Sequence, residues 1–285
     1  MSKDIKIITT VIDYIESHLH KKLDLETVAE AVHYSKYHLH RMFRGTVGLT
    51  IHDYVQRRQL TEAAKLLVFS DRPILEIALI ARYESQQSFT DIFKAMYKKS
   101  PNQYRKEEEF YPLQLRYVLN ENPTNLKESD WEKKIVFATD EDISEWIKLV
   151  HLVIDGFPHL NEKQYMEQLR EYIKNRQAWI LKDADTAIGI MAFNERTGDI
   201  DFLGVHPQYP KKGIVKTFCE KALYEFVYSP EITVTTFREG DKADTGYREI
   251  YKSLGFAEAE LLMEFGYPTQ RFILRKEKWE DKEHG

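Results

Sequence analysis

Two short stretches, about fifty residues apart, carry side chains suited to binding nucleic acid: Ser35–Arg44 and Ser85–Lys94. In the first, the helical period puts Leu39, Met42 and Phe43 on one side. The basic and aromatic residues of the other side are Lys36, Tyr37, His40, Arg41 and Arg44. Such a face can present cations to phosphates and polar groups to base edges in a major groove of DNA.

A third stretch, residues 206–216, could bind an anion. It joins an expected strand, residues 200–205, to a helix expected from about residue 213 to 228. Amides at a helix N-terminus and the helix dipole favour a phosphate there. Strand–loop–helix joints of this composition are also common without any ligand, so the loop alone is a weak sign. Its basic and glycine residues are Lys211, Lys212, Gly213 and Lys216.

The chain length and composition are those of a two-domain globular protein. With 285 residues, 42% hydrophobic and 31% charged, it can bury two cores. A single cysteine, Cys219, excludes an intramolecular disulfide framework and a cysteine-rich zinc site, and we expect no metal. No apolar run approaches a membrane span, and the first twenty residues read as an amphipathic helix instead of a signal peptide. We therefore expect a cytoplasmic protein with no membrane partner.

The two halves of the chain differ in charge. Residues 1–110 contain 17 lysines and arginines against 15 aspartates and glutamates, whereas the remainder contains 24 against 31. A slightly basic half joined to an acidic one is typical of a DNA-binding domain fused to another module.

The first half contains the same helical motif twice. A short amphipathic helix, residues 25–32, precedes His33-Tyr34, and Ser35 caps the next helix. After a long helix over residues 50–67, a helix at 74–81, a turn at 82–84 and the cap Ser85 repeat the pattern. The spacing predicts two helix-turn-helix units in one chain, which could read successive major grooves.

Residues 3–107 resemble the AraC/XylS family, specifically its MarA/SoxS/Rob-like subgroup. The resemblance implies double-stranded DNA as a partner, RNA polymerase as a further one, and a role in transcription regulation. It also implies that Tyr37, His40 and Arg41 approach DNA from the first reading helix, and Gln86, Gln87 and Ser88 from the second. The matching residues are 34–43, 54–58, Pro73-Ile74, Ile77-Ala78, 84–87, Phe93-Lys94 and 100–105.

Two residues depart from that family's pattern. Arg82 stands where a glycine is usual, which costs about 1 kcal/mol if the backbone keeps a positive φ. Asp91 stands where a basic residue is usual in the second reading helix, and phosphates would repel it. The second unit is therefore expected to bind DNA more weakly than the first.

The second half reads as alternating strands and helices after a connector. Residues 110–130 read as the connector, with one strand expected near residues 115–119. Then follow a strand at 135–137, two helices, three strands at 178–181, 187–193 and 200–205, the loop and helix described above, a strand at 232–236, a helix through Tyr251 and two last strands. The turn at 196–199 predicts antiparallel pairing of the second and third of the three strands.

This order resembles the GNAT N-acetyltransferase superfamily over residues 133–277. The residues that carry the resemblance are 203–207, 212–214, Tyr251, Gly255-Phe256 and 266–268. It implies acetyl-CoA as acyl donor and an amine, of unknown identity, as acceptor. In acetyl transfer, the resemblance implies that Tyr251 would protonate the CoA thiolate and that Asp201 would deprotonate the amine. The residues implied to hold acetyl-CoA are Leu203, Gly204, Val205, Lys211, Lys212, Gly213, Ile214, Val215 and Lys216.

The loop also departs from the superfamily pattern. Pro210 replaces a usual polar residue, and Val215 adds a branched side chain where the backbone should approach phosphate closely. Both weaken the expectation of tight acetyl-CoA binding, and the lysines of the loop could offset the loss.

We therefore expect a multidomain protein with an all-α double helix-turn-helix domain followed by an α+β acyl-CoA N-acyltransferase-like domain with a mixed, mostly antiparallel sheet. The expected boundaries are 1–109 for the DNA-binding domain, 110–130 for the linker and 131–285 for the acetyltransferase-like domain. The expected function is a sequence-specific transcriptional regulator that binds acetyl-CoA and transfers its acetyl group to an amine. One alternative is a C-terminal domain that is an inactive ligand sensor or dimerisation module, and another is an enzyme with a degraded DNA-binding half.

Overall fold

The computed structural model describes residues 2–124, 126–153, 162–226, 228–264, 266–277 and 279. The described chain forms two compact units, one built mainly from the chain up to Asn122 and one mainly from Pro123 onward. The helix expected from residue 140 to about residue 154 ends outside the described part, and so do the C-terminal residues 280–285 of the expected second domain. None of the helices in the described ranges is long and apolar enough to cross a membrane.

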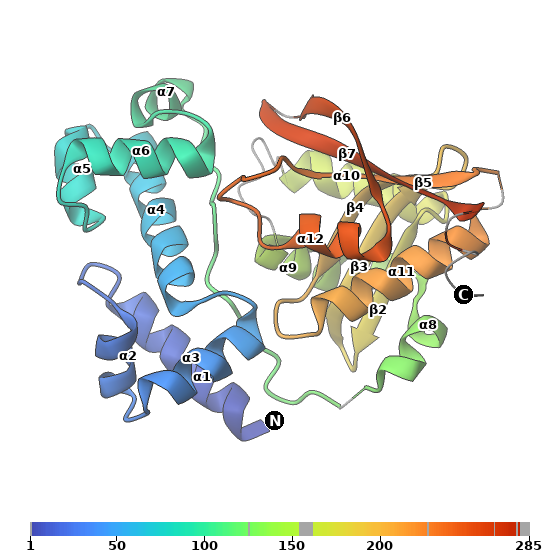
Figure 1. The fold of residues 1–285 in the computed structure, drawn as a ribbon, viewed down its shortest axis with the longest axis horizontal. Coiled ribbons are helices and arrows are strands. Elements are labelled where there is room, and N and C mark those ends of the chain that lie inside the picture. The colour runs from blue at the N-terminus through green and yellow to red at the C-terminus, as the bar shows by residue number, and fades with distance from the viewer. Residues whose placement is uncertain are drawn as a thin grey trace. The chain divides into compact units, whose positions relative to one another are not determined.

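The described secondary-structure elements of the first unit are all helices, as expected. Figure 1 shows the long helix α4 between a group formed by α1, α2 and α3 and a group formed by α5, α6 and α7. Side-chain oxygens of Asp24, Ser35, Thr50, Ser85 and Ser100 cap α2, α3, α4, α6 and α7. The helices are α1 Ser2–Ser17, α2 Leu25–Ala31, α3 Lys36–Val47, α4 Ile51–Phe69, α5 Ile74–Ile80, α6 Gln86–Tyr97 and α7 Pro101–Glu107.

The second unit is built on a seven-stranded sheet with the strand order β1-β2-β3-β4-β5-β7-β6. Only the β4–β5 pair is parallel among the described pairings. The fold class and the element order expected from the sequence are confirmed. The elements are η1 Glu128–Asp130, α8 Trp131–Lys134, β1 Val136–Phe137, η2 Asp140–Asp142, α9 Ile143–Val153, α10 Glu162–Lys174, β2 Ala178–Asp183, β3 Thr186–Asn194, β4 Asp199–Val205, α11 Lys211–Glu225, β5 Glu231–Phe237, α12 Tyr247–Leu254, β6 Ala257–Glu264 and β7 Tyr267–Arg275.

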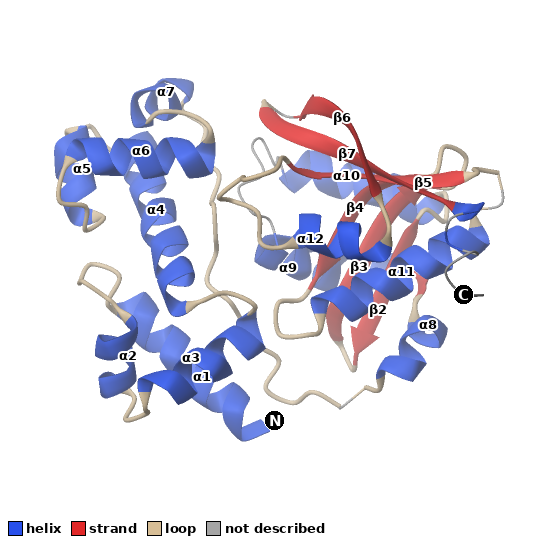
Figure 2. Cartoon of the chain, in the orientation of Figure 1, coloured by secondary structure: helices blue, strands red, loops and turns tan. Residues whose placement is uncertain are grey.

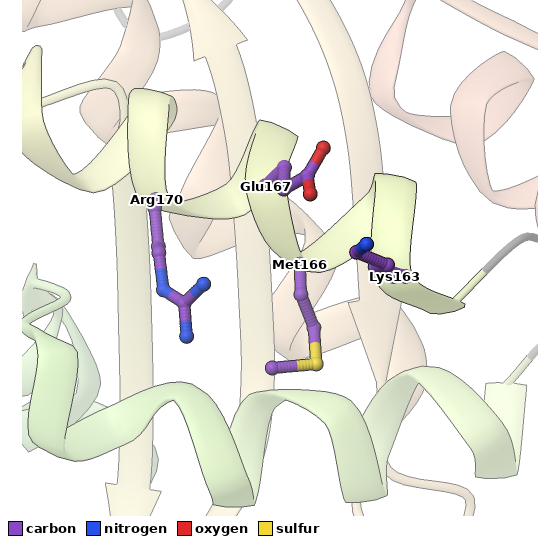
Figure 3. Close-up of a pocket in the computed structure, with 4 residues that line it drawn as sticks. All are labelled: Lys163, Met166, Glu167 and Arg170. Carbon is purple, nitrogen blue, oxygen red and sulfur yellow. The ribbon is translucent and has the colours of Figure 1, made fainter.

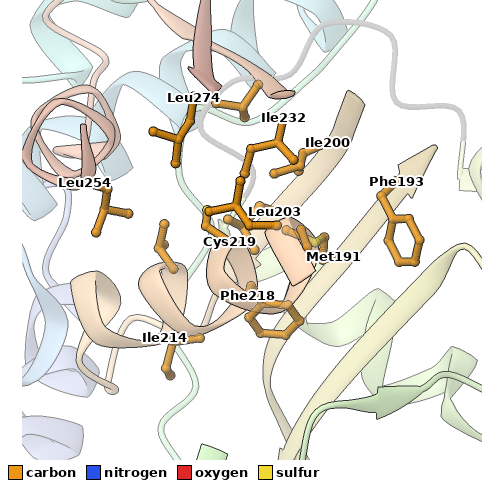
Figure 4. Packing of buried hydrophobic residues seen from close by; sticks show 14 of the residues in the cluster. Met191, Phe193, Ile200, Leu203, Ile214, Phe218, Cys219, Ile232, Leu254 and Leu274 are labelled. Atoms are coloured by element: carbon orange, nitrogen blue, oxygen red, sulfur yellow. The ribbon is translucent and has the colours of Figure 1, made fainter. Parts of the chain in front are cut away.

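Helices cover both faces of this sheet (Figure 2). Side chains of α9 and α10 meet β4 from one face, where Val153 lies against Gly204 and Tyr165 lies against Phe202. Successive side chains of β4 alternate between the two faces, and its apolar residues on the second face pack against α11. Ile214 and Phe218 of α11 are fully buried there. Figure 4 shows this core, which also takes in Cys219, buried as a small apolar residue.

The expected strand near residues 115–119 is absent from the described connector, and this prediction was wrong. The segment pairs with no described strand, and side chains of α4 bind backbone groups in it and in the adjoining Gln114. The amide of Gln114 donates to the Thr61 hydroxyl, the amide of Tyr117 donates to the Tyr54 hydroxyl, and Arg58 donates to the carbonyl of Gln114. The connector up to residue 119 therefore packs as part of the helical unit.

Candidate functional site

The first helix-turn-helix unit is α2, a three-residue turn and α3. Asp24 caps α2, and in the turn the amide of Tyr34 donates to the carbonyl of Ala29 at 3.0 Å. The turn residue His33 has φ 59, in the left-handed region. Ser35 then caps α3 by accepting from the amide of His38. The turn thus sets the angle at which α3 leaves α2.

The second unit, α5 and α6, repeats this geometry. The amide of Tyr83 donates to the carbonyl of Ala78 at 2.9 Å, and the turn residue Arg82 has φ 69. The turn is one residue longer than the first, since Glu84 precedes the cap Ser85. Arg82 keeps the strained geometry that the sequence anticipated for a position where glycine is usual.

The outer face of α3 carries the residues expected to contact DNA. Leu39 and Phe43 are fully buried beneath it. Of the residues named from the sequence, Lys36, Tyr37, Arg41 and Arg44 are exposed and His40 is half-buried. Tyr37 is 75% exposed, although an aromatic ring usually gains from burial. An exposed aromatic residue amid cations is suited to a nucleic-acid surface.

The outer face of α6 differs from that of α3. Gln86, Gln87 and Ser88 are exposed at its first turn, as expected. The Gln87 amide nitrogen donates to the Asp91 carboxylate at 2.9 Å, so Asp91 fixes the orientation of a side chain expected to read bases. Ser88 donates its hydroxyl to the carbonyl of Ser85, which makes it part of the cap.

In the C-terminal unit, which contains the sheet, the parallel strands β4 and β5 separate. Their paired residues are Asp199 with Thr233 and Ile200 with Val234, although β4 continues to Val205. Beyond Ile200, the edge of β4 that faces β5 is therefore open, and the backbone of Leu203, Gly204 and Val205 lies along the opening. This is the edge that the sequence associated with the acyl donor.

The loop after β4 is held by a hydrogen bond to Asp183, the last residue of β2. The buried carboxylate of Asp183 accepts from the Tyr209 hydroxyl at 2.7 Å and from the amide of Thr124. Helix α11 then begins at Lys211, after Pro210, with no side-chain cap on its first amides. An uncapped N-terminus beside Lys212, which is exposed, retains the electrostatic character of an anion site.

The two glycines of the expected acetyl-CoA site are explained by packing. A Cβ at Gly204 would lie 2.9 Å from a methyl of Val153, and a Cβ at Gly213 would lie 2.8 Å from the ring of Trp131 and 2.5 Å from the carboxylate of Glu128. Chain segments already fill the space beside both glycines, so neither glycine is by itself evidence of a ligand.

The side chains of Ile214 and Val215 are fully buried in the core. The concern that the branched side chain of Val215 obstructs a phosphate is therefore wrong, because that side chain packs inward. The remaining expected residue, Lys216, is exposed and lies 3.4 Å from the carboxylate of Glu220.

Asp201 lies where β4 and β5 begin to separate, on the face covered by α10. Its carboxylate accepts from the Tyr172 hydroxyl at 2.9 Å. Partial burial raises the pKa of Asp201, the Tyr172 hydrogen bond lowers it, and the nearby Asp199 raises it, so that the pKa lies above its ordinary value. A carboxylate with a raised pKa is a better proton acceptor.

Tyr251 lies on the opposite face, in the core with α11. It is 2% exposed, and its ring packs against Phe256 and Phe272. The structure therefore does not bring Asp201 and Tyr251 into contact, and they lie on the two sides of the opened sheet.

Two further tyrosines were missed by the sequence reasoning. Tyr172 orients Asp201, and Tyr247 accepts a hydrogen bond from the amide of Val205 at 3.3 Å. Tyr247 precedes Tyr251 by four residues, so helical spacing could have placed both on one face of α12. Nothing local could have linked Tyr172 to Asp201.

A shallow hollow lies on α10 and is lined by Lys163, Met166, Glu167 and Arg170 (Figure 3). Its described lining residues all belong to α10, and they include neither Asp201 nor Tyr251.

The helical unit has many relatives. Residues 28–107 match the model of a helix-turn-helix domain family. SoxS of Escherichia coli is 39% identical over 100 residues, which are 94% of that protein and 35% of this chain. Rob of Salmonella typhimurium is 40% identical over 110 residues, 38% of its length. An uncharacterized regulator of Bacillus subtilis, YbfP, is 40% identical over 34% of its length. The match thus spans little more than a third of Rob and YbfP.

Solved structures resemble each part of the chain. The C-terminal domain of AraT, a response regulator from Geobacillus stearothermophilus, is 31% identical, covers 39% of this chain and 93% of its own, and gives a TM-score of 0.35. A GNAT-family acetyltransferase from Bacillus cereus is 14% identical, covers 50% of this chain and 95% of its own, and gives a TM-score of 0.39.

Proposed function

This chain belongs to the AraC family of helix-turn-helix transcriptional regulators, and from that premise we propose that α3 and α6 bind successive major grooves of one double-stranded DNA site. The observation that carries the proposal is the repeated turn, with the same hydrogen bond in both units and an exposed polar first turn in both second helices. We place the protein in the cytoplasm, with RNA polymerase as its further partner.

The salt dependence of DNA binding tests this proposal. A lysine or arginine that contacts phosphate releases counterions, so Arg41→Ala should reduce the slope of log K against log salt by about one. Lys36→Ala should have a smaller effect, because Lys36 already lies 3.5 Å from the Glu26 carboxylate. Arg116→Ala is the matched control, since Arg116 is also exposed but pairs with Asp13 outside the reading helices. A flat slope in the parent chain would contradict the proposal.

For the C-terminal unit we propose acetyl-CoA binding and transfer of the acetyl group to an amine. The opened edge of β4 at Leu203–Val205 and the uncapped first turn of α11 would hold the pantetheine arm and the pyrophosphate. Bound acetyl-CoA supplies an acyl group activated as a thioester. Two features support the fit, namely the separation of β4 from β5 and the charge of Lys211 and Lys212 at a helix N-terminus that has no side-chain cap.

The residues of this chain would then divide the proton transfers between the two faces of the sheet. On the α10 face, Asp201, held by Tyr172, would accept the proton that the amine nitrogen loses as it bonds to the acetyl carbonyl carbon. On the α11 face, the Tyr251 hydroxyl would donate a proton to the sulfur as the carbon–sulfur bond breaks. The acceptor is an amine that reaches Asp201 from the α10 side.

A second candidate function has a specific observation in its favour. Tyr251 is almost fully buried, and the amide of Val205 already has a partner in Tyr247. Both features suit a unit that does not catalyse transfer and acts instead as a ligand sensor or a dimerisation module.

Titration calorimetry with acetyl-CoA, combined with a CoA-release assay on a panel of amines, separates the candidates. Micromolar binding with turnover that falls at least tenfold in Tyr251→Phe and Asp201→Asn supports the enzyme. Tyr228→Phe, at an exposed tyrosine, is the control and should match the parent. Binding without turnover supports the sensor, and no binding at millimolar acetyl-CoA contradicts both the enzyme and a sensor of acetyl-CoA.

A further inference from the structure

Tyr247, the first residue of α12, contacts the three elements of the proposed acetyl-CoA site. Its hydroxyl accepts from the backbone amide of Val205 on β4 at 3.3 Å. The ammonium group of Lys211 on α11 lies 4.5 Å from the centroid of its ring. On its own helix, its ring stacks with that of Tyr251, with centroids 6.2 Å apart. The side chain thus lies at the meeting point of the opened strand, the helix N-terminus and the proposed acid.

The hydrogen bond to Val205 uses a donor that the opened strand offers. The amide of His206 donates to the carbonyl of Ile188 on β3. Because amides alternate along a strand, the amide of Val205 is directed to the other side, where β5 no longer pairs with β4. The Tyr247 hydroxyl takes the place of the acceptor that a neighbouring strand would supply.

The contact with Lys211 holds a cation of the proposed phosphate site. An ammonium group over an aromatic face is attracted by the ring, and the attraction grows as water is excluded. While Lys211 lies on the ring, it is positioned for the aromatic face and not for an anion. The Tyr247 side chain therefore occupies both the Val205 amide, proposed to bind the pantetheine arm, and the Lys211 ammonium group, proposed to bind the pyrophosphate.

We propose that Tyr247 is a built-in competitor for acetyl-CoA, which must displace its side chain to gain the Val205 amide and Lys211. This inference rests on the proposed acetyl-CoA function. The residue before it, Gly246, has φ 98 and caps α12 without a side-chain bond. The chain can reorient there without a Cβ clash, so displacing Tyr247 need not unfold α12.

Two substitutions in the full-length chain separate the two contacts. Tyr247→Phe removes the hydroxyl and keeps the ring, so acetyl-CoA should bind about two- to tenfold more tightly, since one competing hydrogen bond is lost. Phosphoadenosine diphosphate, the nucleotide portion of CoA, should bind to Tyr247→Phe with the same affinity as to the parent chain. Tyr247→Ala also removes the ring, so the nucleotide portion should bind about two- to fivefold more tightly as well.

The matched control is Tyr165→Phe. The Tyr165 hydroxyl also accepts an N–H, from the Trp146 indole at 2.9 Å, but on the α10 face. This variant should bind acetyl-CoA and the nucleotide portion as the parent does. Amide hydrogen exchange without ligand gives an independent measurement, in which Tyr247→Phe should speed exchange at Val205 and Tyr165→Phe should not.

The outcomes distinguish this inference from the function on which it rests. If the parent binds acetyl-CoA and Tyr247→Phe binds it equally or more weakly, the competitor role fails and the acetyl-CoA function stands. Unchanged exchange at Val205 in Tyr247→Phe also overturns the competitor role. If neither the parent nor either Tyr247 variant binds acetyl-CoA, the proposed function fails together with the inference. Binding by the variants alone supports both.

Discussion

His33 and Arg82 have a left-handed backbone conformation, which glycine adopts more easily than other residues. Each lies in the turn of one helix-turn-helix unit. A side chain at such a φ is strained against its own backbone by about 1 kcal/mol. Arg82 is exposed, so its removal costs little packing. We expect Arg82→Gly to raise the free energy of unfolding by about 0.5–1 kcal/mol, measured by chemical denaturation.

His33→Gly offers an internal comparison, because its φ is also left-handed. It should stabilise the chain by a similar amount. A loss of stability in both variants would show that the side chains contribute more than the strain costs.

The raised pKa of Asp201 gives a second prediction, for which the sign follows from proton linkage. Between the ordinary pKa of an aspartate and the raised pKa in the folded chain, the folded state binds more protons than the unfolded state. The free energy of unfolding therefore falls as pH rises through that window. In Asp201→Asn this fall should be smaller, as measured by denaturation at a series of pH values.

Activity should show the opposite dependence on pH. If Asp201 is the base, CoA release in the parent increases as pH rises through the raised pKa, because only the carboxylate accepts a proton. Asp201→Asn should lose most of that activity while it is at least as stable as the parent at neutral pH. A variant that is both less stable and inactive would indicate a structural role for the carboxylate.

Helix α11 depends on a glycine for a reason unrelated to any ligand. A Cβ at Gly213 would lie 2.8 Å from the Trp131 ring of α8, so Gly213→Ala should lower the free energy of unfolding by about 1–3 kcal/mol. Gly45, on helix α3, is the matched control because nothing lies within 4 Å of its Cβ position. Gly45→Ala should stabilise the chain by about 0.5–1 kcal/mol through helix propensity.

Thermal denaturation of both alanine variants measures the difference. Equal effects on the melting temperature would mean that α8 moves away from α11 at little cost. The packing explanation of Gly213 would then be wrong.

The sequence predicted the helices and strands well where the signals are local. Caps such as Ser35 and Ser85, and the apolar spacing of α3, depend on residues within a few positions of one another. The partner of the Val205 amide could not be predicted, because Tyr247 lies 42 residues further along the chain. The false strand near 115–119 has a similar origin, since the amide of Tyr117 donates to Tyr54 of α4, 63 residues earlier, and the adjoining backbone of Gln114 binds Thr61 and Arg58 of the same helix.

Across the molecule, the connector is shorter than its composition suggests. Its first part packs on the helical unit through the buried Tyr117 and Leu119, and its last part is held by the bond from Thr124 to Asp183 and by the buried Trp131. The described residues between these anchors centre on Glu121 and Asn122, both exposed. We expect limited proteolysis with a glutamate-specific protease to cut first after Glu121.

Mass spectrometry of the first fragments tests this expectation. A first cut within Glu107–Glu109 or at Glu128 would contradict it. Either result would show that one end of the connector opens more readily than its contacts suggest.

The two turns of the reading units differ in length, and so do the side chains that follow them, with lysine and tyrosine opening α3 and two glutamines opening α6. Because the two DNA-facing helices differ, the helical unit in which α4 connects them has no internal two-fold symmetry. If α3 and α6 bind one DNA site as proposed, that site has a direction and does not read the same on both strands. Reversing such a site relative to a gene would reverse the protein on the DNA, so the two orientations would present different surfaces of the regulator to a promoter.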